Sequence, residues 1–354
     1  MREASSIVDD TTRPAVTIGI PVYRPDVRAF ERCLESALGQ SFEGPVEILA
    51  VLDGAEENRD LLSSGVFDKF PEVRVVGREH GGEGSARNAI IDLARGEWLV
   101  FLDADDRLDE RAVERLVACA QRYGADLVSS NHWRVYSEER RAADYFDGER
   151  LWRGGECDGF LDVVLSSGTD QGTVWGKAFS LDFLRGHGLG FDMSLVNGVD
   201  QEFMVRCVKH ASCIAAIPDR TYFYVYSSGS VVRGFSPAYP DLLLATLKQV
   251  SVDLGLSDVD ANGSALFNHY ALDRFLMLVI NYLCHPEFDG GYAARRARFS
   301  EAISSYPYQG ALAGARLEDF SVSRRFVILC ARRGFFAPIR FVGWLRHRQL
   351  RGRG

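Results

Sequence analysis

Apolar runs of strand length alternate with helix-spaced apolar positions over the first 130 residues. Strand-like runs cover 16–22 and 46–52, and a shorter run covers 73–76. Other apolar residues recur three and four positions apart, as on one face of a helix: Phe30, Leu34, Ala37 and Leu38; Ala86, Ala89, Ile90, Leu93 and Ala94; Val113, Leu116, Val117 and Ala120. This alternation predicts an α/β fold, with a mostly parallel central sheet and helices on both faces.

The strand predicted at 98–102 is followed by three carboxylates. The strand itself is apolar throughout, and Asp103, Asp105 and Asp106 come within the next four residues. An unpaired carboxylate is costly to bury, so carboxylates at the end of a parallel strand favour a divalent cation that holds a phosphorylated substrate. The competing interpretation is that Asp105 and Asp106 cap a helix starting near Leu108.

Two other predicted strands end in polar turns on the same edge of the sheet. Tyr23 follows the strand at 16–22, and Asp53 ends the strand at 46–52. The Asp53 carboxylate is suited to accept a hydrogen bond from a nucleobase or a ribose hydroxyl, and equally to form an Asp-Gly turn. Polar residues gathered at one edge are typical of a ligand site in an open α/β sheet.

A glycine-rich segment at 80–88 precedes another predicted helix. It lacks the lysine of a P-loop, and Arg87 stands where the dinucleotide-binding pattern has its third glycine. The segment suits an anion at a helix N-terminus with Arg87 as a phosphate or base ligand, and it equally suits a flexible turn.

The rest of the sequence divides into a leader, an irregular middle and a helical end. Residues 1–14 are polar and predict a disordered leader, whereas glycine-rich turns interrupt residues 131–238. Helical periodicity returns over 239–354. We therefore expect boundaries near residues 14, 130 and 238.

Charge is distributed unevenly along the chain. A net charge of −8 argues against a general nucleic-acid binder. After Asp319 the sequence has nine arginines and no acid, which leaves −17 on the remainder. The arginines alternate with apolar residues, namely Phe335, Phe336, Ile339, Phe341, Val342, Trp344 and Leu345. Such a tail suits a membrane surface, an acidic partner, a contact in a homo-oligomer or a solvated helix end.

The cysteines and the lack of long apolar stretches indicate where in the cell we expect the protein. Seven scattered cysteines without metal-ligand spacing favour free thiols in a reducing cytosol. No signal-peptide core or bilayer-spanning stretch is evident in the sequence. We expect a cytoplasmic protein, peripheral at the inner face of the membrane if the basic tail binds lipid.

Several short motifs occur in an order that resembles glycosyltransferase family 2, the inverting enzymes of GT-A fold. The resemblance covers residues 15–130 and continues more weakly to about residue 235. The stronger motifs are Pro21-Val22-Tyr23, Ser36-x-x-x-Gln40, Asp53-Gly54, Gly84-x-x-Arg87-Asn88, Gly96-Glu97-Trp98 and Phe101-Leu102-Asp103-Ala104-Asp105-Asp106. The weaker ones are Val174-Trp175-Gly176-Lys177, Gly198-Val199-Asp200-x-x-Phe203 and Tyr222-x-Tyr224 followed by Gly229-Ser230.

This resemblance implies a Rossmann-like GT-A domain with a nucleotide-sugar-binding half at 15–130 and a catalytic, acceptor-binding half at 131–238. By the same resemblance, Asp53 contacts the nucleobase, Asp103 the ribose or sugar, Asp105 holds Mn²⁺ or Mg²⁺, and Asp200 is the catalytic base. Further implied donor contacts are Pro21, Tyr23, Gly84, Arg87 and Ala104. Candidates for the acceptor or sugar pocket are His132, Trp133, Trp175, Lys177 and Arg233, of which the aromatic residues equally suit the core.

Three positions depart from the family pattern. Leu52 replaces the first of two acids, Ala55 replaces the serine after Asp-Gly, and Val199 replaces glutamate before Asp200. No Gln-x-x-Arg-Trp motif is present, which argues against a processive synthase.

The sequence thus predicts a metal-dependent inverting glycosyltransferase that uses a nucleotide sugar, UDP-linked by preference. Its acceptor would be a glycan, a lipid-linked glycan or a natural product. A sugar-phosphate nucleotidyltransferase would need a Gly-rich, Arg-containing loop where this chain has Pro21-Val22-Tyr23-Arg24. A phosphatase of the haloacid-dehalogenase type would carry Asp-x-Asp on its first strand. A degenerate sugar-nucleotide-binding module remains an alternative because of Ala55 and Val199.

Overall fold

The computed structural model describes residues 13–137, 139–166, 168–226, 235–257 and 264–351. Two compact units make up the chain. The first comprises Met1–Leu161, Thr173–Met193 and Arg206–Tyr226, and the second comprises Asp162–Gly172, Ser194–Val205 and Ser227–Gly354.

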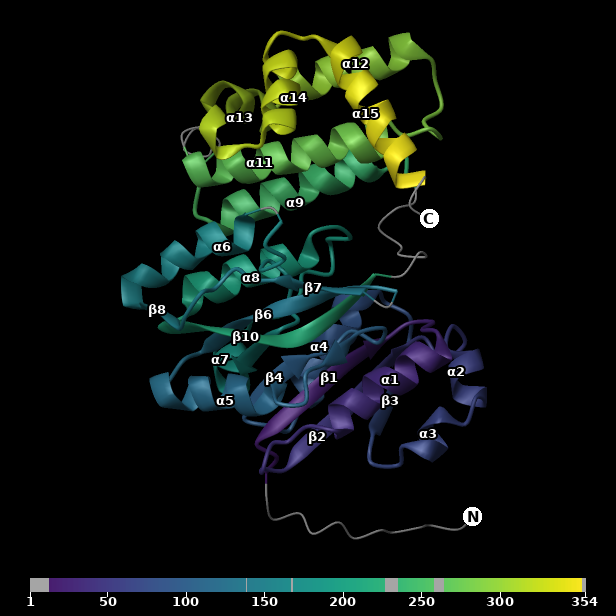
Figure 1. Cartoon of the computed structure of the whole chain (residues 1–354), viewed down its shortest axis with the longest axis vertical. Coiled ribbons are helices and arrows are strands. Elements are labelled where there is room, and N and C mark those ends of the chain that lie inside the picture. The colour runs from purple at the N-terminus through teal and green to yellow at the C-terminus, as the bar shows by residue number, and fades with distance from the viewer. Residues whose placement is uncertain (1–12, 138, 167, 227–234, 258–263, 352–354) are drawn as a thin grey trace. The chain divides into compact units, whose positions relative to one another are not determined.

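A ten-stranded sheet forms the centre of the first unit (Figure 1). Its strands are β1 (Val16–Val22), β2 (Val46–Asp53), β3 (Arg74–Arg78), β4 (Trp98–Phe101), β5 (Arg107–Leu108), β6 (Leu127–Tyr136), β7 (Glu139–Ala143), β8 (Arg150–Arg153), β9 (Lys177–Ser180) and β10 (Cys213–Tyr226). The order is β3-β2-β1-β4-β9-β6-β10-β5, with β7 beside β6 and β8 beside β10. Strands β1 to β4 pair in parallel, as do β6 and β10, whereas β9 runs antiparallel to both of its neighbours.

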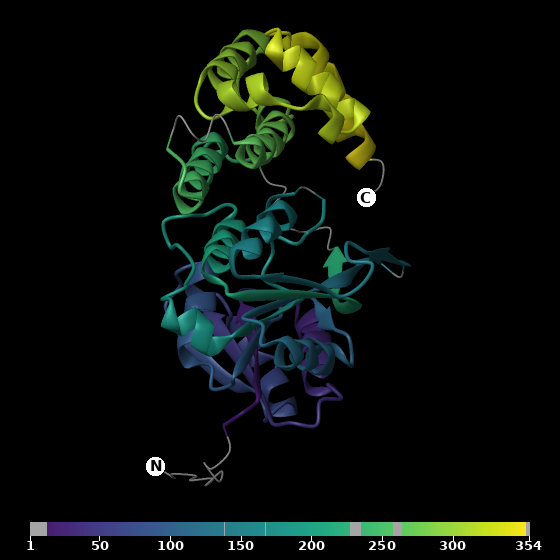
Figure 2. The same ribbon diagram turned by 90° about the vertical axis from the view of Figure 1, so that its left-hand side faces the viewer.

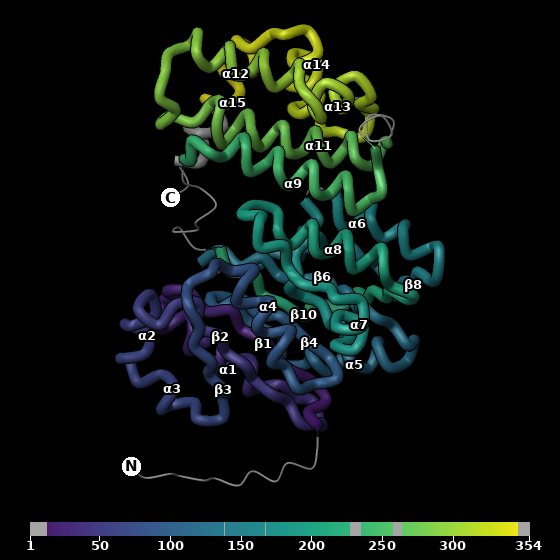
Figure 3. The backbone as a smooth tube through the Cα atoms, turned by 180° about the vertical axis from the view of Figure 1, so that it is seen from behind, coloured from purple at the N-terminus to yellow at the C-terminus, as the bar shows by residue number. Residues whose placement is uncertain are grey.

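Helices pack on both faces of this sheet (Figure 3). They are α1 (Val27–Leu38), α2 (Arg59–Ser63), α3 (Val66–Lys69), α4 (Glu83–Leu93), α5 (Ala112–Tyr123) and α7 (Leu181–Gly186), with the 3₁₀ segment η1 (Gly154–Phe160). The apolar sides of α1 and α5 join one core with alternate residues of β1, β2 and β4. Helix α4 lies on the other face, so close to β1 that a Cβ at Gly19 would come within 2.3 Å of Ile90. Glycine at this position therefore permits the helix to pack.

The second unit is helical (Figure 2). Its elements are α6 (Leu161–Leu165), the start of α8 (Val199–His210), α9 (Tyr239–Asp253), α11 (Ala265–Leu278), the π-helical turn η3 (Val279–Leu283), α12 (Tyr292–Ser304), α13 (Tyr308–Gly314), the 3₁₀ turn η4 (Leu317–Asp319), α14 (Val322–Arg332) and α15 (Phe336–Arg351). Helix α11 packs against α9 and α13, and large buried rings fill this core: Phe267, Tyr270, Phe275, Phe299, Tyr308 and Phe336.

The structure confirms the α/β fold and the mostly parallel sheet with helices on both faces. The helix expected to start near Leu108 begins instead at Ala112, because the chain first forms the short strand β5 against β10. The predicted helical end, 239–354, lies within the second unit. The domain boundaries stay predictions, and most of the predicted leader lies outside the described residues.

All seven cysteines are free thiols, as expected, and the structure shows that all of them are buried. Within the described ranges, every helix is too short or too polar to cross a bilayer.

Candidate functional site

The three clustered carboxylates lie in the loop that follows β4, at the carboxyl end of the strand. Two backbone hydrogen bonds shape this loop: Leu102 N–H donates to Gly19 O at 3.0 Å, and Asp106 N–H donates to Asp103 O at 3.0 Å. Each carboxylate then meets a different environment. Asp103 is partly buried, Asp105 is exposed and Asp106 is only 1% exposed.

Asp106 is a buried anchor and not a helix cap, so the capping interpretation was wrong for this residue. Its Oδ2 accepts a hydrogen bond from the Tyr222 hydroxyl at 2.8 Å, and its Oδ1 accepts one from Val225 N–H at 2.7 Å. The Tyr222 oxygen in turn accepts from Asp103 N–H at 3.1 Å. Tyr222 on β10 therefore fixes both ends of the carboxylate loop.

Crowding of the carboxylates shifts their proton affinities. Burial, followed by the Asp103 and Asp105 charges, raises the pKa of Asp106 well above its usual value. Partial desolvation and the Asp103 charge also raise the pKa of Asp105. A cation next to Asp105 would relieve this repulsion.

Arg87 links the glycine-rich segment to this loop. Its guanidinium donates to Asp103 Oδ1 at 3.0 Å and pairs with Glu83 at 2.6 Å, one helical turn earlier on α4. The side chain is 3% exposed and stacks over Phe191, with the guanidinium carbon 5.5 Å from the ring centroid. Gly84 lies in the same first turn of α4. Arg87 therefore holds Asp103 in place while it adds positive charge to the site.

Asp53 binds the other end of the glycine-rich segment. Its carboxylate accepts hydrogen bonds from Gly81 N–H and Gly82 N–H at 2.8 and 2.9 Å, and His80 Nδ1 lies 2.8 Å from Oδ2. The His80 ring stacks on Tyr23 at 5.0 Å between centroids. Asp53 thus holds the loop that brings His80 and Tyr23 together, a role that the Asp-Gly turn alone did not predict.

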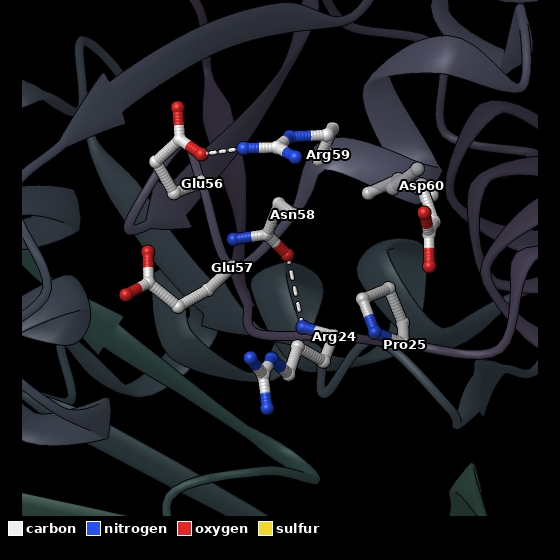
Figure 4. Close-up of a pocket in the computed structure, with 8 residues that line it drawn as sticks. Arg24, Pro25, Glu56, Glu57, Asn58, Arg59 and Asp60 are labelled. Atoms are coloured by element: carbon white, nitrogen blue, oxygen red, sulfur yellow. Dashed lines mark hydrogen bonds and ion pairs between the residues drawn. The ribbon is translucent and has the colours of Figure 1, made fainter.

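Asn58, which sequence reasoning missed, joins the ends of β1 and β2. Its amide donates to Val22 O, Asp53 O and Gly54 O at 3.3, 3.2 and 2.7 Å, while its oxygen accepts from Arg24 N–H at 2.9 Å (Figure 4). A polar hollow of about 470 Å³ lies beside it, lined by Arg24, Pro25, Glu56, Glu57, Asn58, Arg59, Asp60 and Leu61. No local sequence motif pointed to Asn58, because its hydrogen-bond partners lie at the ends of two separate strands.

The Ser36-x-x-x-Gln40 motif supports the far side of the carboxylate loop. Ser36 Oγ accepts from Leu108 N–H at 3.1 Å. The Gln40 amide donates to Asp109 O at 2.9 Å, and its oxygen accepts from Val113 N–H at 3.0 Å. The motif therefore ties α1 to the segment between the carboxylates and α5.

The residues suggested for an acceptor or sugar pocket occupy different environments. Trp175 and His132 are buried, and Trp175 stacks on Tyr222 at 4.7 Å between centroids. Lys177 is also buried, with its ammonium 3.4 Å from Trp175 O. Trp133 is partly exposed, and the guanidinium carbons of Arg140 and Arg220 lie 4.8 and 4.5 Å from its ring centroid. Their contacts with sugar stay predictions, and Arg233 lies outside the described residues.

Asp200 is partly buried in the first turn of α8. The preceding Gly198 has a positive φ of 69°, and a Cβ there would come within 2.7 Å of Thr246. The N-terminal end of a helix favours a negative charge, which suits an ionised carboxylate. Asp200 belongs to the second unit and the carboxylate loop to the first. Its role as a base therefore stays a prediction.

The donor set suits a cation shared with a substrate. Within the described ranges, no cluster of three or more His, Cys, Asp or Glu side chains is arranged to hold a metal ion. Mg²⁺ is commonly bound by one or two carboxylates together with substrate phosphates, which needs no such cluster. The exposed Asp105, with its raised pKa, fits this mode of binding.

One protein family matches part of the chain. Residues 17–153 match the family described as Glycosyl transferase family 2. Over these residues, which make up less than half of the chain, it is similar to glycosyl transferase family 2. The match includes the carboxylate loop, Asp53 and Arg87, but ends before Trp175 and Asp200.

Two bacterial proteins are similar over longer stretches of the chain. The putative glycosyltransferase EpsH of Bacillus subtilis is 25% identical over 63% of this chain and 64% of its own length. The succinoglycan biosynthesis protein ExoO of Rhizobium meliloti is 28% identical over 66% of each chain. The chain thus spans slightly less than two thirds of these relatives.

A solved structure has the same fold over most of the chain. Residues 1–349 of Staphylococcus aureus TarS, in complex with UDP-GlcNAc, superpose with a TM-score of 0.66 at 15% identity. The superposition covers 94% of this chain and 91% of the TarS chain. The GT-A type of fold expected from the sequence is therefore confirmed, together with a helical C-terminal region.

Replacing Tyr222 by Phe should destabilise the first unit. The change removes the hydroxyl between Asp103 N–H and Asp106, and so leaves a buried carboxylate and an amide each short of a partner. We expect a loss of about 1–3 kcal/mol in the free energy of unfolding, measured by urea denaturation. The matched control is Tyr145→Phe, because the Tyr145 ring is exposed. Equal stability of both variants and the parent would contradict the anchoring role.

In the presence of a chelator, which removes divalent metal, the Asp105→Asn variant should be more stable than the parent at neutral pH but not at acidic pH. Because folding raises the pKa of Asp105, its contribution to stability is present below its unfolded pKa and is lost as the pH rises through the folded value. Parent and variant should therefore melt alike near pH 3.5. At pH 7.5 the variant should melt about 1–2 °C higher by scanning fluorimetry. An unchanged difference across this pH range would count against carboxylate crowding.

Proposed function

We propose that the protein is an inverting glycosyltransferase that moves a sugar from a UDP-linked donor to an acceptor hydroxyl with the help of a divalent metal. The observation that carries this proposal is the carboxylate loop, in which Asp105 is exposed beside two other carboxylates and has a raised pKa. Such a loop at the carboxyl end of a parallel strand suits a metal and a diphosphate together.

The donor would lie along the edge formed by β1, β2 and β4. Its nucleoside end would contact Pro21, Tyr23 and Asp53, next to the polar hollow beside Asn58. Arg87, Asp103 and Ala104 would face the sugar and the diphosphate. Structures of TarS in complex with UDP and with UDP-GlcNAc support the choice of a UDP-linked donor, because this chain has the same fold.

Inverting transfer is a single displacement at the anomeric carbon. When bound to Asp105, Mn²⁺ or Mg²⁺ would supply positive charge for the leaving diphosphate. Arg87, held against Asp103 and largely excluded from water, adds a fixed charge at the same place. Asp200 would take the proton of the acceptor hydroxyl as the new bond forms.

The proposed acceptor is a glycan. The relative named for succinoglycan biosynthesis supports a glycan or lipid-linked glycan acceptor. His132, Trp133, Trp175 and Lys177 are the acceptor-side candidates. We place the protein in the cytoplasm, where such donors are made.

A thermal-shift screen of nucleotide sugars tests the proposal directly. Ligand that binds the folded state raises the melting temperature, so a UDP-sugar should do so in Mn²⁺ or Mg²⁺ and much less in chelator. Transfer to acceptor, or slow hydrolysis of that donor, should follow. If donor binds without transfer or hydrolysis, the alternative of a degenerate binding module holds. If no nucleotide sugar binds, the proposal fails.

A further inference from the structure

Helix α15 packs into the second unit through one side. Phe336 and Ile339 are fully buried, and Gly343 lies so close to Cys284 that a Cβ there would come within 2.5 Å of it. These positions are three and four residues apart and therefore share one face of the helix. Among the side chains of α15 that the structure describes, the buried ones lie on this face.

The opposite side of α15 is also apolar but faces solvent. Phe341, Trp344 and Leu345 are 60%, 51% and 40% exposed. Their spacing places them on one side of the helix, opposite the packed positions. The rings of Phe341 and Trp344 stack at 6.0 Å between centroids, so they form a continuous apolar surface. We call Phe341, Trp344 and Leu345 the outer face of α15.

Exposed arginines occur on α15 and just before it. Arg340 is exposed within α15, and Arg333 is exposed just before the helix. The sequence of α15 adds three more arginines, and no acidic residue occurs anywhere in 320–354. The helix therefore combines outward aromatic side chains with a local excess of positive charge, while the rest of the chain carries the opposite sign.

We propose that the outer face of α15 binds the surface of a bilayer that contains anionic lipid. Aromatic and aliphatic side chains of a surface helix enter the boundary between headgroups and acyl chains, and flanking arginines pair with lipid phosphates. An acidic protein would pair with the arginines, but it would not remove the exposed apolar surface of Phe341, Trp344 and Leu345 from water. The helix lies on the membrane in this arrangement and does not span it.

Flotation of the full-length protein with lipid vesicles tests this proposal. Binding to vesicles of phosphatidylcholine with phosphatidylglycerol should exceed binding to phosphatidylcholine alone by about tenfold or more, and should fall in high salt. The double variant Phe341→Ser/Trp344→Ser should lose about tenfold in binding. Leu62→Ser, an equally exposed apolar position on α2, should bind like the parent.

Charge variants test whether the arginines on and near α15 contribute to the binding of anionic lipid. Arg333→Gln/Arg340→Gln should weaken binding to anionic vesicles, whereas Arg28→Gln, an exposed arginine on α1, should not. Equal melting temperatures confirm that each variant is folded. Equal binding to both kinds of vesicle, or none, would overturn the proposal. A dimer in light scattering that the double variant disrupts, with no vesicle binding, would assign the face to a second copy instead.

Discussion

Replacing Asp200 by Asn should lower the rate of glycosyl transfer by about 10²–10⁴-fold while donor binding stays intact. Asparagine keeps the size of the side chain but cannot take the proton of the acceptor hydroxyl. The loss should therefore appear in kcat, and the thermal shift caused by a UDP-sugar with metal should stay close to that of the parent. Steady-state kinetics together with the donor-induced melting shift measure both quantities.

Asp241→Asn is the matched control for this variant. Asp241 also lies in the first turn of a helix in the second unit, and its side chain is exposed. It should keep parental activity. Full transfer by Asp200→Asn would show that the base is another group, and Glu202, buried in the same turn of α8, is then the next residue to replace.

Replacing Asp105 by Ala should abolish the metal-dependent part of donor binding and lower transfer by about 10³-fold. Asp103 is already engaged with Arg87 and Asp106 with Tyr222, so neither is expected to take over the role of Asp105. The melting shift produced by Mn²⁺ with a UDP-sugar should disappear. Calorimetric titration of Mn²⁺ in the presence of UDP gives an independent measurement.

Asp92→Ala provides the control, because Asp92 is an exposed carboxylate on α4 of the same unit. Comparing Asp105→Ala with Asp200→Asn also separates metal-dependent donor binding from proton transfer. Asp105→Ala should lose donor binding and transfer, whereas Asp200→Asn should lose transfer alone. An Asp105→Ala protein that still shows a metal-dependent shift would remove Asp105 from the metal site.

The elements of the fold were predictable where the sequence pattern is local. Strand β1 covers the expected residues 16–22, and α4 contains the apolar positions expected for a helical face except Ala94, which follows its last residue. Both follow from a short periodic pattern that needs no knowledge of distant partners. The start of α5 was less predictable, because β5 forms only by pairing with β10, more than one hundred residues later.

The candidate site was likewise only partly predictable from the sequence. The sequence singled out Asp53, Arg87, Asp103 and Asp105 as chemically important, and the structure gathers them at one edge of the sheet. The sequence did not reveal that Asp53 holds the His80–Gly82 loop, or that Arg87 is paired with both Glu83 and Asp103. These contacts depend on how loops from separate strands approach one another.

The α/β architecture, the edge at which polar residues collect and the carboxylates that follow β4 could all be predicted from local sequence patterns. These features depend on the spacing of apolar residues and on where each strand ends. Which carboxylate faces solvent and which is buried depends instead on residues far away in the chain. Asp106 and Asp105 are adjacent in the chain, but Tyr222 and Val225 on β10 enclose one and leave the other exposed. Desolvation and hydrogen bonding depend on these distant neighbours, so identical residue types acquire different roles.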